Sequence, residues 1–237
     1  MKQELQIRCK NNKKTVNISI GSSLFEIFDE INLKMDFGPV SAKVNNKVEG
    51  LNYRVYHNKD VEFLDLYSPS GSRAYTRTLF FFFFMAANDI FPGRKMVIDI
   101  PVSHGYYCDL QSDVPLSEDD VARIRARMQE IIDAKMPIRR YECTTEQAVK
   151  LFEEVGDMAK VRLLKTTGKL YTLYYDLGGY KDYYYGTLLT NTGQIHLFDL
   201  VKYYDGMLLR IPSLNDPSKL GELVRQDKLF EIFKEHH

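Results

Sequence analysis

Arginine, lysine and tyrosine side chains gather in two separate stretches of the sequence, "RAYTR" and "KDYYY". The residues of interest are Arg73, Tyr75, Arg77, Lys181, Tyr183, Tyr184 and Tyr185. Cationic groups bind phosphate and phenol rings stack on nucleobases, so this combination suits a nucleotide or RNA. Tyrosine is dense here, because seven of the sixteen tyrosines lie between positions 171 and 185. The alternative is that every second tyrosine packs on a sheet while the others face water.

Hydrolytic, metal-binding and phosphate-loop signatures do not accompany these residues. GxGxxG, HExxH and GxSxG are absent, and "TTGKLY" lacks the upstream glycine and the following Ser or Thr of a P-loop. The three cysteines are far apart and form no CxxC pair, which argues against a disulfide framework and a zinc site. We therefore expect no catalytic residue, metal or cofactor in this chain, and a reducing cytoplasm as its location.

The charge balance excludes a general attraction to polyanions. The chain has 237 residues, of which 32 are basic and 32 acidic, so no net field draws it to nucleic acid or to an anionic membrane. An RNA contact would need a local basic patch, and we expect neither DNA nor a membrane as a partner. The longest apolar stretch, 79–87, is about half a membrane span. With 44% hydrophobic residues, the chain can fill the core of one large or two small domains.

The first segment, residues 1–67, has the pattern of a small domain with a helix and several strands. Apolar residues alternate between positions 5 and 20, which predicts a β-hairpin. Ser23 and Glu26 have the spacing of a capping box and begin a short amphipathic helix. Short strands follow over residues 40–66, separated by turns that contain asparagine.

The second segment, residues 70–212, begins with a helix that contains five consecutive phenylalanines in "RTLFFFFFM". Residues 67–75, "YSPSGSRAY", have the composition of a linker, and the helix is expected to stop at Phe91. Helical side chains advance by about 100° per residue, so five in a row surround the helix instead of forming one stripe. This helix must therefore be covered on most of its sides.

Two strands, two helices and then a sheet are predicted after this helix. Residues 93–110 predict two strands, Ser117 caps a strong amphipathic helix, and residues 143–156 predict another helix with Val155 on its inner face. From Lys160 onward, aromatic and β-branched residues with glycine turns predict one antiparallel sheet. We expect an α+β chain whose second segment places a long buried helix on an antiparallel sheet.

The first segment resembles a TGS domain, a small β-grasp module of threonyl-tRNA synthetases, certain GTPases and stringent-response enzymes. The similar stretches are "GSSLFEI", "AKVNNK" and "NKDVEFL", and they cover nearly all of residues 1–67. The resemblance implies a β-grasp fold and a contact with a ligand or RNA, without catalysis. The alternative is a module that only packs against its neighbours, because the segment has no basic stripe.

The second segment resembles the editing domain, or second additional domain, of threonyl- and alanyl-tRNA synthetases. The similar stretches are "FPGRKMVIDIPVSHGYYCDL", "SEDDVARIRARMQEII", "TTEQAVKLFEEVGDMAKVRLL" and "TGQIHLFDL". That family has two histidines four residues apart on the long helix, and a cysteine and a histidine four apart near the later sheet. The matching positions are Arg77, Phe81, Tyr184 and Leu188. Phenylalanine and leucine can neither bind a metal ion nor move a proton, and arginine stays protonated at any working pH, so the resemblance implies an editing fold without its hydrolytic chemistry.

The order of the segments resembles the front half of bacterial uridine kinase-like proteins. A TGS-like domain (1–67) and an editing-like domain (70–212) are followed by a linker and the start of a truncated helix (213–237). The resemblance implies a non-catalytic accessory or regulatory region, whose partner is a downstream kinase domain of the same polypeptide. ATP and Mg²⁺ are implied only for that domain. The alternatives are a stand-alone module that binds tRNA or a nucleotide, and a metal-free editing hydrolase, for which the pocket offers no suitable base.

Overall fold

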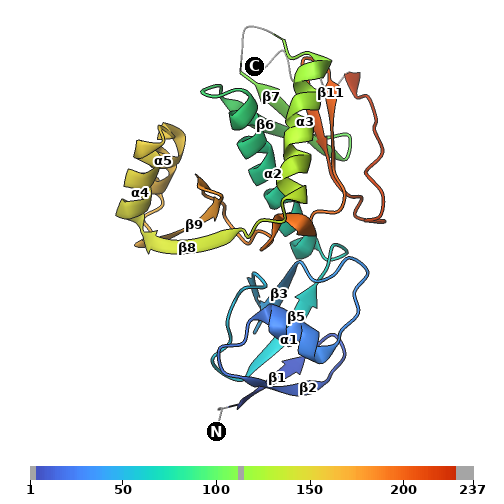
Figure 1. Cartoon of the computed structure of the whole chain (residues 1–237), viewed down its shortest axis with the longest axis vertical. Coiled ribbons are helices and arrows are strands. Elements are labelled where there is room, and N and C mark those ends of the chain that lie inside the picture. Colours follow the sequence, from blue (N-terminus) through green and yellow to red (C-terminus); the bar gives the residue numbers. More distant parts are fainter. Residues whose placement is uncertain (1–3, 112–114, 228–237) are drawn as a thin grey trace.

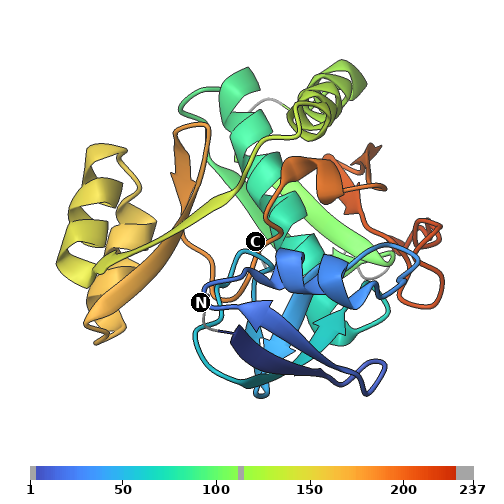
Figure 2. The same cartoon turned by 60° about the horizontal axis from the view of Figure 1, so that its bottom comes forward.

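The computed structural model describes residues 4–111 and 115–227, which contain three sheets. The strands of the N-terminal sheet are β1 (Glu4–Cys9), β2 (Thr15–Ser19), β3 (Ser41–Val44), β4 (Lys47–Glu49) and β5 (Lys59–Leu64). They lie in the order β2-β1-β5-β3-β4, with β1 parallel to β5 and the other neighbours antiparallel. Helix α1 (Leu24–Ile31) packs its apolar face on this sheet (Figures 1 and 2). The predicted order of hairpin, helix and short strands is confirmed.

Two helices begin with the capping boxes that the sequence indicates. The Ser23 hydroxyl accepts a hydrogen bond from the Glu26 amide at 3.2 Å, and the Glu26 carboxylate accepts one from the Ser23 amide at 2.6 Å. At the start of α3 (Glu118–Asp133), Ser117 and Asp120 make the same reciprocal pair. The buried face of α3 includes the predicted residues Val121, Ile124, Met128 and Ile131.

Helix α2 (Pro69–Ile90) begins earlier than the sequence predicts. The Ser68 hydroxyl accepts a hydrogen bond from the Gly71 amide at 3.0 Å, and Pro69 occupies the first turn, where a missing N–H costs nothing. The linker predicted for residues 67–75 is therefore mostly helix, and that prediction is wrong. Gly71 is required by close packing, because a Cβ there would lie 1.9 Å from a backbone carbonyl oxygen.

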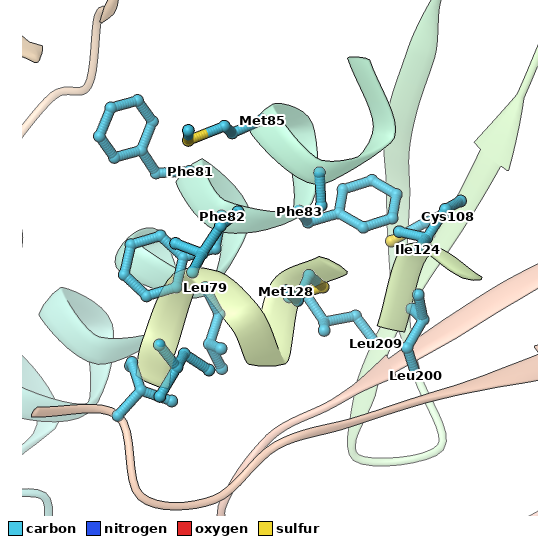
Figure 3. Packing of buried hydrophobic residues seen from close by; sticks show 14 of the residues in the cluster. Leu79, Phe81, Phe82, Phe83, Met85, Cys108, Ile124, Met128, Leu200 and Leu209 are labelled. Carbon is cyan, nitrogen blue, oxygen red and sulfur yellow. The ribbon is translucent and has the colours of Figure 1, made fainter. Parts of the chain in front are cut away.

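The five phenylalanines lie on α2, and Phe81, Phe82 and Phe83 are completely buried. Phe80 and Phe84 are only partly buried, and they lie one turn apart on the same side of the helix. Figure 3 shows the buried side chains of α2 packed with those of α3 and of the strands beside them. The predicted coverage of the helix on most sides is confirmed, and one stripe of α2 stays less covered.

The central sheet lies beside α2 and α3. It consists of β6 (Met96–Val102), β7 (Gly105–Leu110), β11 (Asp199–Tyr203) and β12 (Gly206–Arg210) in the antiparallel order β11-β12-β7-β6. Cys108, Leu200 and Leu209 of this sheet are buried in the same apolar core as the phenylalanines. The two strands predicted for residues 93–110 are confirmed as β6 and β7.

A separate unit projects to one side of α2 (Figure 1). It contains β8 (Arg139–Thr144), β9 (Tyr171–Leu177) and β10 (Tyr180–Asp182) in the order β10-β9-β8, together with α4 (Thr145–Glu154) and α5 (Met158–Thr166). The two helices pack against the sheet through a small core that includes Phe152, Val161 and Leu164. We call residues 139–182 the side unit.

The prediction of one antiparallel sheet from Lys160 onward is wrong in two respects. Residues 158–166 form α5, because Val161 and Leu164 are three positions apart and become buried together, as helical spacing allows. The later strands also divide between two sheets, since the β11–β12 hairpin pairs with β7 and not with β10. Between β10 and β11 lies only one short 3-10 helix, η1 (Thr192–Gln194). Val155 follows the end of α4 and is 64% exposed, so its predicted inward position is also wrong.

The two segments predicted from the sequence share a border at the start of α2. Val40 and Leu66, which precede α2, pack into the core of the second segment. The boundary at residues 67–70 therefore stays a prediction.

The helix predicted around Leu229, Ile232 and Phe233 lies outside the described residues. Within the described ranges, no helix combines the length and apolar character needed to cross a lipid bilayer.

Candidate functional site

The four positions that the resemblance matches with the hydrolytic motif of the editing family lie on α2 and on the loop after β10, and these two segments contact each other. Arg77 donates from Nε and Nη2 to the Thr187 carbonyl oxygen, at 3.2 and 3.1 Å. The rings of Phe81 and Tyr184 pack edge to face with centroids 5.8 Å apart, and Leu188 is buried in the same core. The site is filled by packed side chains. Phe81 and Leu188 have no ligand atom, Arg77 is a cation, and burial raises the pKa of the Tyr184 hydroxyl, so these four residues do not form a set of metal ligands.

Further contacts fix the loop that carries Tyr184 and Leu188 to α2. Thr78 accepts a hydrogen bond from the Leu189 amide at 2.9 Å, and the Tyr175 hydroxyl donates to the Gly186 carbonyl at 2.8 Å. Gly186 has a φ of +114°, and a Cβ there would lie 2.9 Å from the Arg77 guanidinium. Glycine suits this position for two reasons: it tolerates the positive φ angle, and its lack of a Cβ leaves room for the Arg77 guanidinium.

Tyr75 is a structural residue and does not line a pocket with Arg77. It is 1% exposed, and its hydroxyl donates to the Leu197 carbonyl at 2.9 Å while accepting from the amides of His196 and Leu197. Burial raises the pKa of the Tyr75 hydroxyl to about 12. This residue ties α2 to the segment before β11, so its predicted place in a ligand pocket needs correction.

The other predicted side chains point to different surroundings. Lys181 lies on β10 opposite Asp176, and Tyr183 packs against the core of the side unit. Tyr185 is 82% exposed, with the Lys169 ammonium 5.1 Å from its ring centroid. Tyr184 packs on Phe81. The structure therefore does not gather the seven predicted residues into one pocket, and it leaves Arg73 and Arg77 as the pair that shares a site.

Arg73 and Arg77 line a groove of about 350 Å³ along the less covered stripe of α2. The stripe consists of positions 69, 72, 73, 76, 77 and 80, which follow helical spacing, and the other walls are Tyr67, Tyr106, Ile211 and Leu214. Phe80 and Tyr106 pack edge to face at 4.8 Å. Sequence reasoning missed Phe80 and Tyr106 as part of a site, although Phe80 lies three residues after Arg77 and so on the same face.

The two arginines have no acidic partner within ion-pair distance in residues 4–111 and 115–227. Arg73 bonds only the Ser70 hydroxyl, at 3.1 Å, and Arg77 uses two of its five N–H donors on Thr187. Burial lowers the pKa of the Arg77 guanidinium, and the charge of Arg73 lowers it further. The guanidinium group is a cation, so the groove holds two positive charges that no carboxylate of the described chain pairs with.

A larger cavity of about 630 Å³ adjoins the groove and shares Tyr106, Ile211 and Leu214 with it. Its floor is the β6–β7 turn, where Ser103 and His104 both have positive φ angles, of 50° and 54°. Its other wall is the segment 212–226, which Ser103 holds by accepting a hydrogen bond from the Val224 amide at 2.6 Å. Among the residues that the structure describes, no lysine or arginine lines this cavity.

A partly buried charge cluster, in which only Asp182 is fully buried, lies between α5 and β10 and was not foreseen from the sequence. The Lys160 ammonium lies 2.7 Å from a carboxylate oxygen of Asp157 and 2.6 Å from one of Asp182. Burial alone would lower the pKa of Lys160, but the carboxylates of Asp182 and Asp157 raise it. Burial raises the pKa of Asp182. The spacing of Asp157 and Lys160 on one helical turn was the available signal, while the partner Asp182 comes from a distant strand.

Metal-binding groups are not assembled elsewhere in the part of the chain that the structure describes. There, no group of three or more histidine, cysteine, aspartate or glutamate side chains could hold a metal ion. Cys9, Cys108 and Cys143 are free thiols, and the first two are buried.

The sequence is similar to threonine–tRNA ligases. It is 31% identical over 209 residues to the ligase of Syntrophotalea carbinolica, which covers 84% of this chain and 33% of the ligase. The ligase of Marinobacter nauticus is 26% identical over 164 residues (69% of this chain, 26% of the ligase). That of Pelobacter propionicus is 26% identical over 184 residues (78% and 29%). This chain is homologous to part of a threonine–tRNA ligase.

This homology is compatible with the editing-like domain expected for residues 70–212. The chain spans about a third of the length of the Syntrophotalea ligase, and less of the other two. No family model matches the sequence.

Proposed function

We propose that this chain is a non-catalytic accessory region of a longer cytoplasmic protein, with an editing-type fold that binds a ligand without hydrolysing it. The observation that carries this proposal is the packing of Phe81, Tyr184 and Leu188 at the positions where the editing family has metal-binding and proton-transferring side chains. Arg77, at the fourth position, is bonded to Thr187 and cannot accept a proton at working pH.

The proposal extends to the first segment, which we assign to a TGS-type β-grasp module. Its support is the order β2-β1-β5-β3-β4 with α1 across one face, together with the three sequence stretches that resemble this family. We infer a positioning role for this module. The Glu49 carboxylate, which is nearly buried, lies 3.4 Å from Arg140 of the side unit and joins the two segments.

We further propose that the longer protein is a nucleoside kinase of the uridine kinase type. This idea rests on the resemblance in domain order alone, since the relatives described above are ligases. The coding sequence after His237 tests it. A GxxxxGK[ST] motif downstream would support a kinase domain with ATP and Mg²⁺, and a stop codon directly after His237 would refute it.

The absence of hydrolysis is the first testable prediction. The purified chain is expected to contain no stoichiometric zinc and to leave seryl-tRNA as stable as it is in buffer, because the site has neither a metal ligand set nor a general base. Elemental analysis and a deacylation time course measure both. One zinc per chain, or deacylation that disappears in the Arg77→Ala variant, would refute the proposal of a non-catalytic fold.

A second candidate function is a stand-alone module that binds tRNA or a nucleotide. The pair of uncompensated arginines in the α2 groove favours binding over mere packing. This candidate shares its site with the accessory role and differs only in the presence of a further domain.

A further inference from the structure

The groove on α2 has an excess of positive charge that its own structure does not use. Arg73 and Arg77 lie one turn apart, where like charges repel each other on a helix surface. In residues 4–111 and 115–227, no aspartate or glutamate lines the groove. An anion placed between the two guanidinium groups would relieve this repulsion and use their free N–H donors.

Aromatic and hydroxyl groups surround this charge. Tyr67 is half exposed, and Phe80 and Tyr106 present ring surfaces to the groove. Ser72 and Thr76 lie on the same stripe as the arginines, so hydroxyls also line the groove. Phosphate is the anion whose oxygens match paired guanidinium and hydroxyl donors, and the rings offer a surface for a base attached to it.

The adjoining cavity limits the ligand to one with few phosphates. A nucleic acid strand that left the groove past Tyr106 would enter a cavity whose described lining includes Glu222 but no lysine or arginine. A single nucleoside meets favourable groups there, because Asn215 and Gln226 carry amides that can pair with the edge of a base. The combined space suits a small molecule better than a polynucleotide.

We propose that the α2 groove and the adjoining cavity bind one nucleoside 5′-phosphate, with the phosphate between Arg73 and Arg77 and the base beyond Tyr106. The inference rests on the proposed ligand-binding role and names the class of ligand. It assigns no chemical step, and the nucleotide leaves unchanged. In this arrangement the strained β6–β7 turn, where Ser103 and His104 have positive φ angles, forms the floor of the cavity that holds the base.

Calorimetric titration of the full chain with each of the four common ribonucleoside 5′-monophosphates tests this proposal. At least one is expected to bind about tenfold or more tightly than its own nucleoside and than inorganic phosphate, because only the nucleotide contacts both parts of the site. Arg73→Ala is expected to weaken that binding about fivefold or more. This variant is preferred to Arg77→Ala, since Arg73 is exposed and bonds only Ser70, whereas Arg77 also supports a loop.

Two matched controls separate the ligand site from general charge and from folding. Arg162→Ala removes an exposed arginine from α5, away from the groove, and is expected to leave the affinity unchanged. Tyr106→Phe keeps the ring and is expected to retain binding, whereas Tyr106→Leu is expected to lose most of it while the melting temperature shows that the chain still folds.

Three results would overturn the proposal. The first is that no monophosphate binds more tightly than inorganic phosphate, and the second is that Arg73→Ala and Arg162→Ala behave alike. The third is that an RNA oligonucleotide ending in CCA binds while all four monophosphates fail, which would assign the groove to RNA. None of these results depends on zinc content or deacylation, so the non-catalytic fold and the nucleotide site can fail separately.

Discussion

Replacing Phe83 with alanine is expected to lower the free energy of unfolding by about 3–5 kcal/mol. Its side chain is completely buried, and Figure 3 shows the ring directed toward Cys108 and Ile124. The helix, the central sheet and α3 all contact this part of the core, so the cavity cannot close without moving several elements. Urea unfolding followed by circular dichroism measures the change, which suits a chain without tryptophan.

The neighbouring Phe84 provides a matched control, because it has the same side chain at the next position. It lies on the less covered side of α2 and is only partly buried. Phe84→Ala is therefore expected to cost about 1–2 kcal/mol. Equal losses for the two variants would contradict the unequal burial described above and would mean that hydrophobic content alone explains the phenylalanine run.

Replacing Lys160 with methionine is expected to cost about 2–4 kcal/mol at neutral pH. The substitution leaves the Asp182 carboxylate, whose side chain is 3% exposed, without its cation. Burial raises the pKa of Asp182, and removal of Lys160 is expected to raise it further. A folded state with the higher pKa binds the proton more tightly than the unfolded chain. The loss of stability in Lys160→Met is therefore largest at a pH above the folded-state pKa of Asp182. It becomes smaller as the pH falls toward the pKa that Asp182 has in the unfolded chain.

Asp157 changes the pH dependence in the same direction. Although burial opposes it, the hydrogen bond to Lys160 lowers the pKa of Asp157, so this carboxylate stabilises the fold above its unfolded pKa and loses that effect in acid. The Asp182 part of the difference between wild type and Lys160→Met is therefore expected to shrink as pH falls from 7 toward about 4, and the Asp157 part only below about 4. Denaturation midpoints of both proteins from neutral pH to below pH 4 measure the two parts.

Two further variants distinguish a buried charge from the loss of a side chain. Lys165→Met removes a lysine whose side chain is 58% exposed and paired with Glu153, and it is expected to cost about 0.5 kcal/mol or less. Lys160→Met with Asp182→Asn is expected to recover part of the stability, because no carboxylate then stays buried beside an apolar residue. A deficit that is independent of pH, or that the second substitution deepens, would contradict the role given to Lys160.

Local features of this fold were predictable because their causes lie within one helical turn. Ser23 and Ser117 begin helices through contacts with residues three positions later, and those contacts need no other part of the chain. The coverage of the helix with the phenylalanine run was also predictable from neighbouring residues, because side chains at consecutive positions surround the helix axis. Ser68 and Pro69 carried the same kind of signal, which the linker interpretation overlooked.

The candidate site was predictable only in part. The resemblance to the editing family indicated four matching positions. Of these, Phe81 packs on Tyr184, and Arg77 is bonded to Thr187, the residue before Leu188. Tyr75, however, is bonded to Leu197, 122 positions away in the sequence. No periodicity could show which side of α2 would receive that contact. The tyrosines of "KDYYY" likewise separate to different surroundings because β10 ends within that stretch.

Sequence alone determined that Ser23 and Ser117 begin helices and that the long helix would be buried. These properties depend on residue type and on spacing along one element. Tertiary structure decided which strands pair, which tyrosines are buried, and that Arg73 and Arg77 face a groove without acidic residues. Those properties depend on contacts between distant parts of the chain, where packing and desolvation of whole elements outweigh local preference.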